Sequence, residues 1–230
     1  LFRSGSTGNV ILGKVPLIEP QLSDEFITIL GWADEYRRLK VRANADTPED
    51  AQRSLEFGAE GIGLIRTEHM FMMPERLPIV QDMILAKTEE ERETALTKLL
   101  PMQQKDFYDI LKVMAGLPVT IRLLDPPLHE FLPSIEELLV EVTRLQATGG
   151  DSQKIETRQS LLREVQSRHE FNPMLGHRGC RLGITYPEIY AMQARAIFLA
   201  VSQLVKEGKT ILPEIEIPLV SHVNEIKHLR

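Results

Sequence analysis

Short apolar runs alternate along the 230-residue chain with longer stretches of helical periodicity. Strands are predicted at residues 39–44, 61–68, 118–125, 175–182 and 210–220. The periodic stretches predict helices at residues 46–58, 79–116 with a break at Pro101, 134–170 with a flexible TGGDSQ in the middle, and 186–208. Strands that are apolar on nearly both faces and alternate with helices are typical of a parallel α/β sheet. The pattern alone fits a βα barrel and a doubly wound sheet equally well.

The helix at residues 46–58 has the clearest predicted boundaries. Thr47 is expected to cap its amino end, and Pro48 suits the first helical position. Glu49 and Asp50 then match the positive end of the helix dipole. Gly58 is expected just past the last turn, where the backbone commonly becomes left-handed.

The first 38 residues follow a different pattern. Residues 1–20 predict a short β-piece with a linker, and residues 21–38 predict a helix with Ser23 as its N-cap. The sequence lacks an initiator Met, so we expect the chain to begin inside a longer protein. Any targeting segment would then lie outside it.

Composition narrows the range of partners and compartments. No apolar run approaches the roughly 20 residues that a membrane helix needs, so no membrane partner is expected. A net charge of −6 repels nucleic acid, so none is expected as a partner either. The one cysteine excludes an internal disulfide and is typical of a reducing compartment. We therefore expect an intracellular protein.

Three arginines share a position at or near the ends of predicted strands. Arg66 stands in GLIRTEH, Arg122 in TIRLLDPP and Arg178 in GHRGCR. In parallel α/β proteins the carboxyl ends of the strands face the ligand. The planar guanidinium fork binds phosphate and carboxylate oxygens in pairs. Three converging arginines therefore predict a site for a ligand that carries both groups.

A structural role is the alternative for each arginine. Glu68, Asp125 and Glu130 lie nearby in the sequence, and a strand-end arginine commonly pairs with such a carboxylate. For one arginine alone the structural role is the commoner outcome. Three arginines in the same kind of position favour a shared binding site.

His177 and Cys180 suggest a dyad or a metal site, but the pattern is weak. If residues 175–182 form a strand, side chains three apart point to opposite faces. The chain has no CxxC or HxxxH spacing for zinc, and an unreactive cysteine is commonly buried. We therefore expect Cys180 to be packing, while the role of His177 stays open.

Two further pairs of residues have open roles. His69 and His129 each stand beside an acidic residue, which fits either a hydrogen bond at the rim of a site or plain packing. Glu214 and Glu216 lie two apart on one face of a predicted strand. They could hold a cation, although a solvated or arginine-paired face is the commoner arrangement.

Several longer stretches, spread over nearly the whole chain, carry a resemblance to a known family. They are STGNVILGKV, LKVRANADTPEDA, GAEGIGLIRTEHMF, ERLPIVQDMILA, IRLLDPPLHEFLP, EFNPMLGHRGCRLGITYPEIYAMQARAI and PEIEIPLV. In this order they resemble the phosphoenolpyruvate-utilising enzymes, and within them the pyruvate, phosphate dikinases. The family's phosphoenolpyruvate synthases and its sugar-phosphotransferase Enzyme I resemble the chain less at TEHMF, LDPPLHEF and GHRGCRL.

The resemblance implies a fold and a reaction. In the family, ATP phosphorylates a histidine on a swivelling domain, with inorganic phosphate taking part, and the phosphohistidine then converts pyruvate to phosphoenolpyruvate. The products are AMP, diphosphate and phosphoenolpyruvate, and the reaction is reversible. Residues 1–20 resemble the end of the swivelling domain and residues 21–38 a linker helix. Residues 39–230 resemble about five of the eight strands of a partial (β/α)8 TIM barrel that binds phosphoenolpyruvate and pyruvate.

The resemblance also assigns roles to residues. Arg66, Arg122 and Arg178 match the arginines that bind substrate. Mg²⁺ is implied for the full-length enzyme, with its carboxylate ligands and the proton-donating cysteine expected beyond Arg230. The phosphohistidine and ATP-binding domains are expected before Leu1, so the chain alone is not expected to turn over.

The resemblance also implies partners and a compartment. Two alternative functions are considered as well. The implied partners are the remaining domains of the same chain and a second copy in a homodimer. The implied compartment is the cytoplasm, with a plastid or glycosome as the alternative. Other readings of function are a phosphoenolpyruvate synthase or another family member, and a non-catalytic fragment that binds phosphoenolpyruvate.

Overall fold

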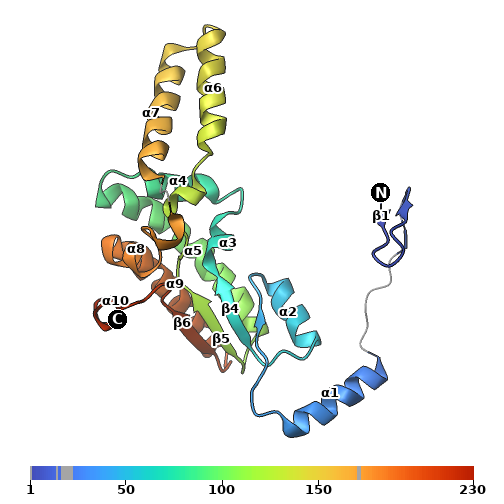
Figure 1. Ribbon diagram of the computed structural model, residues 1–230. Helices are drawn as coiled ribbons and strands as arrows, with labels where there is room; N and C mark the ends of the chain where they lie inside the picture. The colour runs from blue at the N-terminus through green and yellow to red at the C-terminus, as the bar shows by residue number, and fades with distance from the viewer. Residues whose placement is uncertain (1, 14, 17–22, 170–171) are drawn as a thin grey trace. The chain divides into compact units, whose positions relative to one another are not determined.

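The computed structural model describes residues 2–13, 15–16, 23–169 and 172–230 and divides into two compact units, Leu1–Lys40 and Val41–Arg230 (Figure 1). In the first unit, strands β1 (Phe2–Arg3) and β2 (Val10–Ile11) form an antiparallel pair. Helix α1 (Asp24–Tyr36) begins after Ser23, whose hydroxyl accepts a hydrogen bond from the Phe26 amide at 3.3 Å. The predicted N-cap is thereby confirmed.

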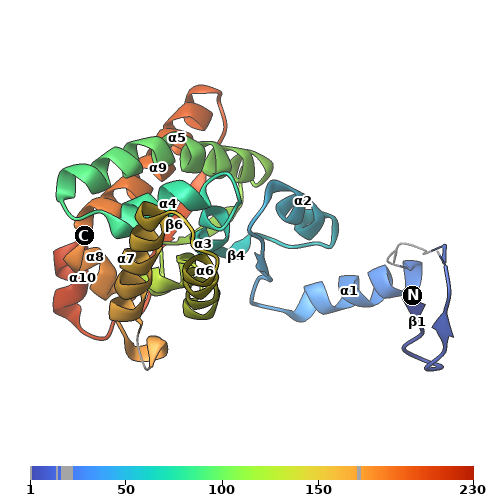
Figure 2. The same ribbon diagram turned by 90° about the horizontal axis from the view of Figure 1, so that it is seen from above.

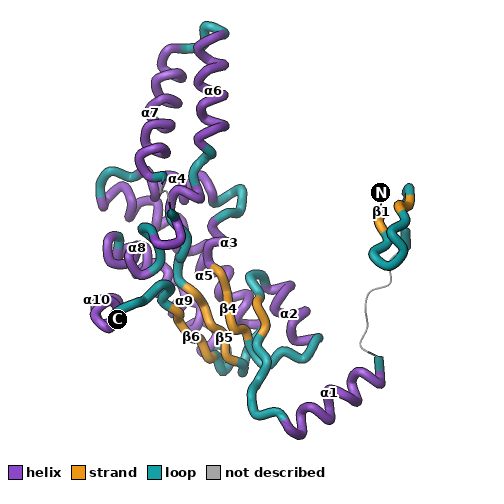
Figure 3. Tube along the Cα trace, viewed as in Figure 1, coloured by secondary structure: helices purple, strands orange, loops and turns teal. Residues whose placement is uncertain are grey.

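The second unit is built on an open parallel sheet of four strands. Its order is β3 (Ala43–Asn44), β4 (Ile62–Arg66), β5 (Pro118–Arg122) and β6 (Leu212–Glu216), so neighbours in the sheet follow the order of the chain (Figure 3). This arrangement confirms the predicted parallel α/β fold and is consistent with part of a βα barrel. The barrel is not closed.

Helices cover one face of this sheet. The long helices α5 (Glu89–Val113) and α9 (Pro187–Lys206) run side by side (Figure 2), and α2 (Pro48–Glu56) follows β3. Val119 and Ile121 of β5 are fully buried, while the alternate residues Thr120 and Arg122 are only partly buried. Side chains alternate across a strand, so β5 has one face in the core and one face free for polar groups.

The boundaries of α2 agree with the sequence prediction. Thr47 accepts a hydrogen bond from the Asp50 amide at 3.1 Å, and Pro48 is the first helical residue. Gly58 has φ of +85°, the left-handed conformation expected after the last turn.

Two sequence predictions were wrong. Residues 175–182 form no strand: a 3-10 turn η2 (Pro173–Leu175) and a short helix α8 (Cys180–Thr185) lie there. Gly179 between them has φ of +57°, which ends any extended conformation. Pro101 does not break the long helix either, because it lies inside α5, whose buried face continues on both sides of it. Core packing outweighs the lost backbone hydrogen bond.

The remaining elements of the second unit are helical. They are α3 (Thr67–Phe71), α4 (Leu77–Leu85), η1 (Leu128–Phe131), α6 (Ile135–Ala147), α7 (Ser152–Arg168) and α10 (Val223–Leu229). Helices α6 and α7 form a hairpin that projects from the body (Figure 1). Among the described residues, no helix is long and apolar enough to cross a membrane.

Candidate functional site

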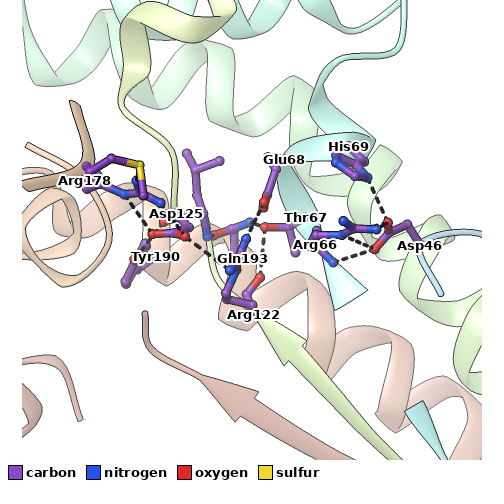
Figure 4. Close-up of polar contacts among 12 residues, drawn as sticks. Asp46, Arg66, Thr67, Glu68, His69, Arg122, Asp125, Arg178, Tyr190 and Gln193 are labelled. Atoms are coloured by element: carbon purple, nitrogen blue, oxygen red, sulfur yellow. Dashed lines mark hydrogen bonds and ion pairs between the residues drawn. The ribbon is translucent and has the colours of Figure 1, made fainter. Parts of the chain in front are cut away.

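The three predicted arginines lie at the same edge of the sheet. Arg66 is the last residue of β4 and Arg122 the last of β5, and the two are direct partners in the register. Arg178 comes from the loop before α8, which is attached to the end of β5 because the Gly179 amide donates to the Asp125 carbonyl at 2.9 Å. Figure 4 shows these side chains in a row across the carboxyl ends of the strands. The structure therefore brings all three together.

Each arginine is paired with a carboxylate that is nearly buried. The arginine row is defined here as the three arginines and these partners: Arg66, Arg122, Arg178, Asp46, Glu68 and Asp125. Arg122 donates to Glu68 Oε1 at 2.5 Å and lies 3.3 Å from Asp125 Oδ2. Arg178 binds both oxygens of Asp125, with Nη2 at 2.8 Å and Nε at 3.3 Å. The Asp125 carboxylate thus contacts both Arg122 and Arg178 and holds their guanidinium groups close to each other.

The bonds to Asp125 also fix the charge of Arg178. They raise the pKa of the guanidinium above its ordinary value, against the opposing effect of burial. The side chain is 15% exposed, so its charge meets little competing water. Of the three carboxylates considered from sequence, Glu68 and Asp125 pair with arginines, whereas Glu130 acts on Arg178 through its charge.

Asp46 holds the third arginine, and sequence reasoning missed it. Its Oδ1 accepts the backbone amide of Arg66 at 2.7 Å, and its Oδ2 accepts Arg66 Nη2 at 2.6 Å. His69 Nδ1 lies 2.8 Å from the same Oδ2. Asp46 lies two residues after the end of β3, near the carboxyl edge of the sheet, and this position was the available sequence signal. His69 therefore lies at the edge of the arginine row, one of the two arrangements considered for it.

The hydrogen bonds to Asp46 determine its ionisation. Burial alone would raise its pKa, but the bonds from Arg66 and His69 outweigh burial and leave the pKa below the ordinary value of 3.8. Asp46 is therefore an anion at neutral pH.

Asp46→Asn is expected to flatten the acid end of the stability profile. Because the folded-state pKa is lowered, the carboxylate contributes stability that is present above pH 3.8 and is lost as the pH falls through the lowered pKa. Urea unfolding between neutral pH and about pH 3 measures this slope. The exposed Asp82→Asn is the matched control. Equal slopes for the Asp46 variant and the original chain would contradict this assignment.

Two buried polar atoms in the arginine row have no partner among the described residues. They are Nε of Arg122 and Oε2 of Glu68. Buried polar atoms nearly always bind protein, water or ligand, and leaving one unpaired is costly. The centre of the arginine row therefore has unused hydrogen-bonding capacity, as a binding site requires.

A buried network from α9 holds the strand ends in place. Gln193 is fully buried; its Oε1 accepts the Leu124 amide at 2.9 Å and its Nε2 donates to Thr67 Oγ1 at 3.0 Å. Thr67 in turn donates to the carbonyl of Arg122 at 3.0 Å. The Tyr190 hydroxyl donates to the Leu124 carbonyl at 2.8 Å, and burial raises its pKa. Sequence periodicity marked these α9 residues only as a helix.

Gln193→Leu is expected to lower the free energy of unfolding by about 2 kcal/mol, because it leaves the buried Leu124 amide without its partner and removes the hydrogen bond to the Thr67 hydroxyl. Gln203→Leu is the matched control on the same helix, since Gln203 is exposed. Chemical denaturation of both variants measures the difference. A loss no larger than that of the control would contradict the network's role.

The other candidates of the GHRGCRL stretch have local partners. His177 Nε2 lies 3.0 Å from Thr185 Oγ1. Cys180 is fully buried, and its thiol donates to the Leu219 carbonyl at 3.3 Å. Burial raises the pKa of the Cys180 thiol, which opposes formation of a nucleophilic thiolate.

The remaining candidates lie outside the arginine row. The His129 ring lies 5.6 Å from the ring of His169. Glu214 is paired with Arg42 at 2.5 Å and accepts a bond from Thr120 at 2.7 Å, so the arginine-paired arrangement holds for it. Glu216 is exposed. Across the described parts of the chain, no group of three or more His, Cys, Asp or Glu residues is placed to hold a metal ion.

The sheet and the arginine row define an α/β protein with a candidate anion site at the carboxyl ends of its strands. A family model described as "PEP-utilising enzyme, PEP-binding domain" matches residues 21–230. The chain therefore belongs to the phosphoenolpyruvate-utilising enzyme family, as its motifs predicted.

Three curated relatives are similar over nearly the whole chain. Pyruvate, phosphate dikinase of Rhizobium meliloti is 52% identical over 98% of the chain and 24% of its own length. The dikinase of Entamoeba histolytica is 54% identical over 98% of the chain and 26% of its own length. The chloroplastic dikinase of Mesembryanthemum crystallinum is 54% identical over 99% of the chain and 24% of its own length. The chain thus spans about a quarter of the length of these relatives.

Proposed function

We propose that the chain is the phosphoenolpyruvate- and pyruvate-binding part of a pyruvate, phosphate dikinase, and that Arg66, Arg122 and Arg178 bind the substrate. The observation that carries this proposal is the common edge: two of the arginines are register partners, and the third shares Asp125 with one of them. The identity to named dikinases supports the reaction and does not favour a synthase or a non-catalytic protein.

The chemistry of the ligand suits this arrangement. Phosphoenolpyruvate carries a phosphoryl group and a carboxylate, which are the two groups that guanidiniums bind in pairs. During phosphoryl transfer, negative charge spreads over the phosphoryl oxygens, and fixed cations stabilise it without reorganising. The buried carboxylates and the α9 network hold the arginines in place before the ligand arrives. Ligand binding therefore loses little conformational entropy, because these side chains are already ordered.

The wider assignments rest on the relatives and on the motifs. We infer that residues 1–20 end a swivelling phosphohistidine domain, that residues 21–38 link it onward, and that residues 39–230 begin the barrel. The expected partners are the ATP-binding and phosphohistidine domains of a full-length chain and a second copy. An intracellular compartment is expected, either the cytoplasm or an organelle. Since the chain spans about a quarter of its relatives, we expect binding rather than turnover from the chain alone.

Mg²⁺ belongs to the reaction proposed for the full-length enzyme, where it would act as a Lewis acid on the transferred group. The described residues of this chain do not themselves fit a metal site, because no cluster of suitable ligands is present among them. We therefore assign none of the described residues a role in holding the ion.

A comparison of ligands by calorimetry tests the proposal. The chain is expected to bind phosphoenolpyruvate at least about tenfold more tightly than pyruvate or inorganic phosphate, since only the first carries both anionic groups. Equal affinity for the three ligands, or no binding of phosphoenolpyruvate, would contradict the assignment of the arginine row.

A further inference from the structure

His69 is the one histidine drawn in contact with the arginine row in Figure 4. It lies in α3, three residues after Arg66, and its side chain is 47% exposed. His69 Nδ1 and Arg66 Nη2 reach the same oxygen of Asp46, at 2.8 and 2.6 Å. An imidazole and a ligand-binding guanidinium are thus held by one carboxylate.

The contact with Asp46 fixes which ring nitrogen carries a proton. The pKa of Asp46 is lowered, so its oxygens only accept hydrogen bonds and Nδ1 must donate. The imidazole Nε2 is not the nitrogen that Asp46 engages. A carboxylate on one nitrogen orients the ring and leaves the other nitrogen for a second partner. In the protonated ring, Nε2–H is a charged donor.

The arginine row has no excess positive charge, so a further charged donor would help it to bind an anionic ligand. Its three guanidiniums face three carboxylates, so the fixed charges of the row balance. A ligand with a phosphoryl group and a carboxylate brings further negative charge. The imidazole contacts the Asp46 carboxylate, which it shares with the cationic Arg66, while Glu68 acts on Arg66 through its charge. Protonation of His69 adds positive charge at the edge of the row.

We propose that His69 is a further ligand-binding residue, whose Nε2–H donates to an anionic oxygen of the ligand bound by Arg66. The proposal rests on the function proposed above and adds a contact to the same site. It also makes binding depend on pH, because the contact is charged only while the imidazole is protonated. The affinity for phosphoenolpyruvate is then expected to be lower at about pH 8 than at about pH 6.

Two substitutions separate this role from a purely structural one. In His69→Asn, the amide nitrogen can take the place of Nδ1 and keep the bond to Asp46, but nothing replaces Nε2. In His69→Gln, the longer side chain can place its amide nitrogen near Nε2, while the bond to Asp46 is lost. Calorimetric titration of each variant with phosphoenolpyruvate, at about pH 6 and about pH 8, is the measurement.

If His69 binds the ligand, His69→Asn weakens binding about tenfold at the lower pH, and His69→Gln weakens it less. Both variants also lose most of the pH dependence seen in the original chain. If His69 only supports Asp46, the order reverses: His69→Asn binds like the original chain and His69→Gln binds weakly. That reversal, or an unchanged pH dependence in both variants, would overturn the proposal. Exposed His228→Asn controls for loss of a histidine elsewhere.

Arg122→Gln distinguishes failure of this inference from failure of the proposed function. If the original chain binds phosphoenolpyruvate, Arg122→Gln does not, and both His69 variants bind normally, only the role of His69 is wrong. If Arg122→Gln binds like the original chain, the function proposed for the arginine row is wrong, and the inference drawn from it fails as well.

Discussion

Arg122→Gln is expected to abolish measurable binding of phosphoenolpyruvate and to lower the free energy of unfolding by about 3 kcal/mol. The loss of binding follows from the central place of Arg122, which is bonded to Glu68 and close to Asp125. The loss of stability has a separate cause: Glu68, whose side chain is 10% exposed, is left without its cation. Calorimetry with phosphoenolpyruvate and urea unfolding measure the two effects.

A double substitution separates the two effects. Adding Glu68→Gln to Arg122→Gln removes the unpaired charge, so most of the lost stability is expected to return while binding stays absent. Arg158→Gln is the matched control, because the Arg158–Glu141 pair lies on the surface with both side chains 43% exposed. Binding that returns together with stability would show that Arg122 only supports the fold.

Gly179→Ala is expected to cost on the order of 3 kcal/mol of stability and to weaken ligand binding as well. Gly179 has φ of +57° and ψ of −132°, a conformation that residues with a Cβ rarely adopt. An added Cβ would also lie 2.8 Å from both Leu219 Cβ and the Pro218 carbonyl oxygen. Relief of these contacts requires a shift of the Arg178 loop or of residues 218–219, and a shift of the loop disturbs the bonds between Arg178 and Asp125. Thermal unfolding measures the loss of stability, and calorimetry measures the loss of binding.

Gly58→Ala is the control for the cost of placing a residue with a Cβ at a positive φ, without a steric clash. Gly58 also has a positive φ, +85°, but an added Cβ there meets nothing within 4 Å. Its cost is expected to stay at about 1 kcal/mol, with ligand affinity unchanged. If Gly179→Ala lost no more stability than Gly58→Ala, the close approach of this loop to the residues after β6 would not be what makes Gly179 necessary.

The parts of the fold that the sequence predicted have strong local signals. The cap at Thr47 and the proline at position 48 fixed the start of α2, and the apolar runs marked β4 and β5. The error at residues 175–182 has a physical reason: the stretch LGHRGCRL is short and carries too few apolar residues for its period to separate a strand from a turn followed by a short helix. Only the contacts of the loop show that Gly179 turns the chain there.

The site was predictable to the extent that it depends on strand ends. The position of the arginines after apolar runs placed Arg66 and Arg122 at one edge, and the register confirms that placement. The partners depend on which strands lie side by side, which no local pattern encodes. Asp46 reaches Arg66 from 20 residues away in sequence, and Gln193 reaches Thr67 from 126. The binding role of the three arginines stays a prediction.

Substrate binding by the three arginines can be tested in a crystal structure of the chain with phosphoenolpyruvate. We expect the phosphoryl and carboxylate oxygens to lie within about 3 Å of guanidinium nitrogens of Arg66, Arg122 and Arg178. Some of the ligand oxygens should meet Arg122 Nε, which has no partner among the described residues. A ligand bound away from the carboxyl edge of the sheet, with the three arginines still paired only with Asp46, Glu68 and Asp125, would contradict this expectation.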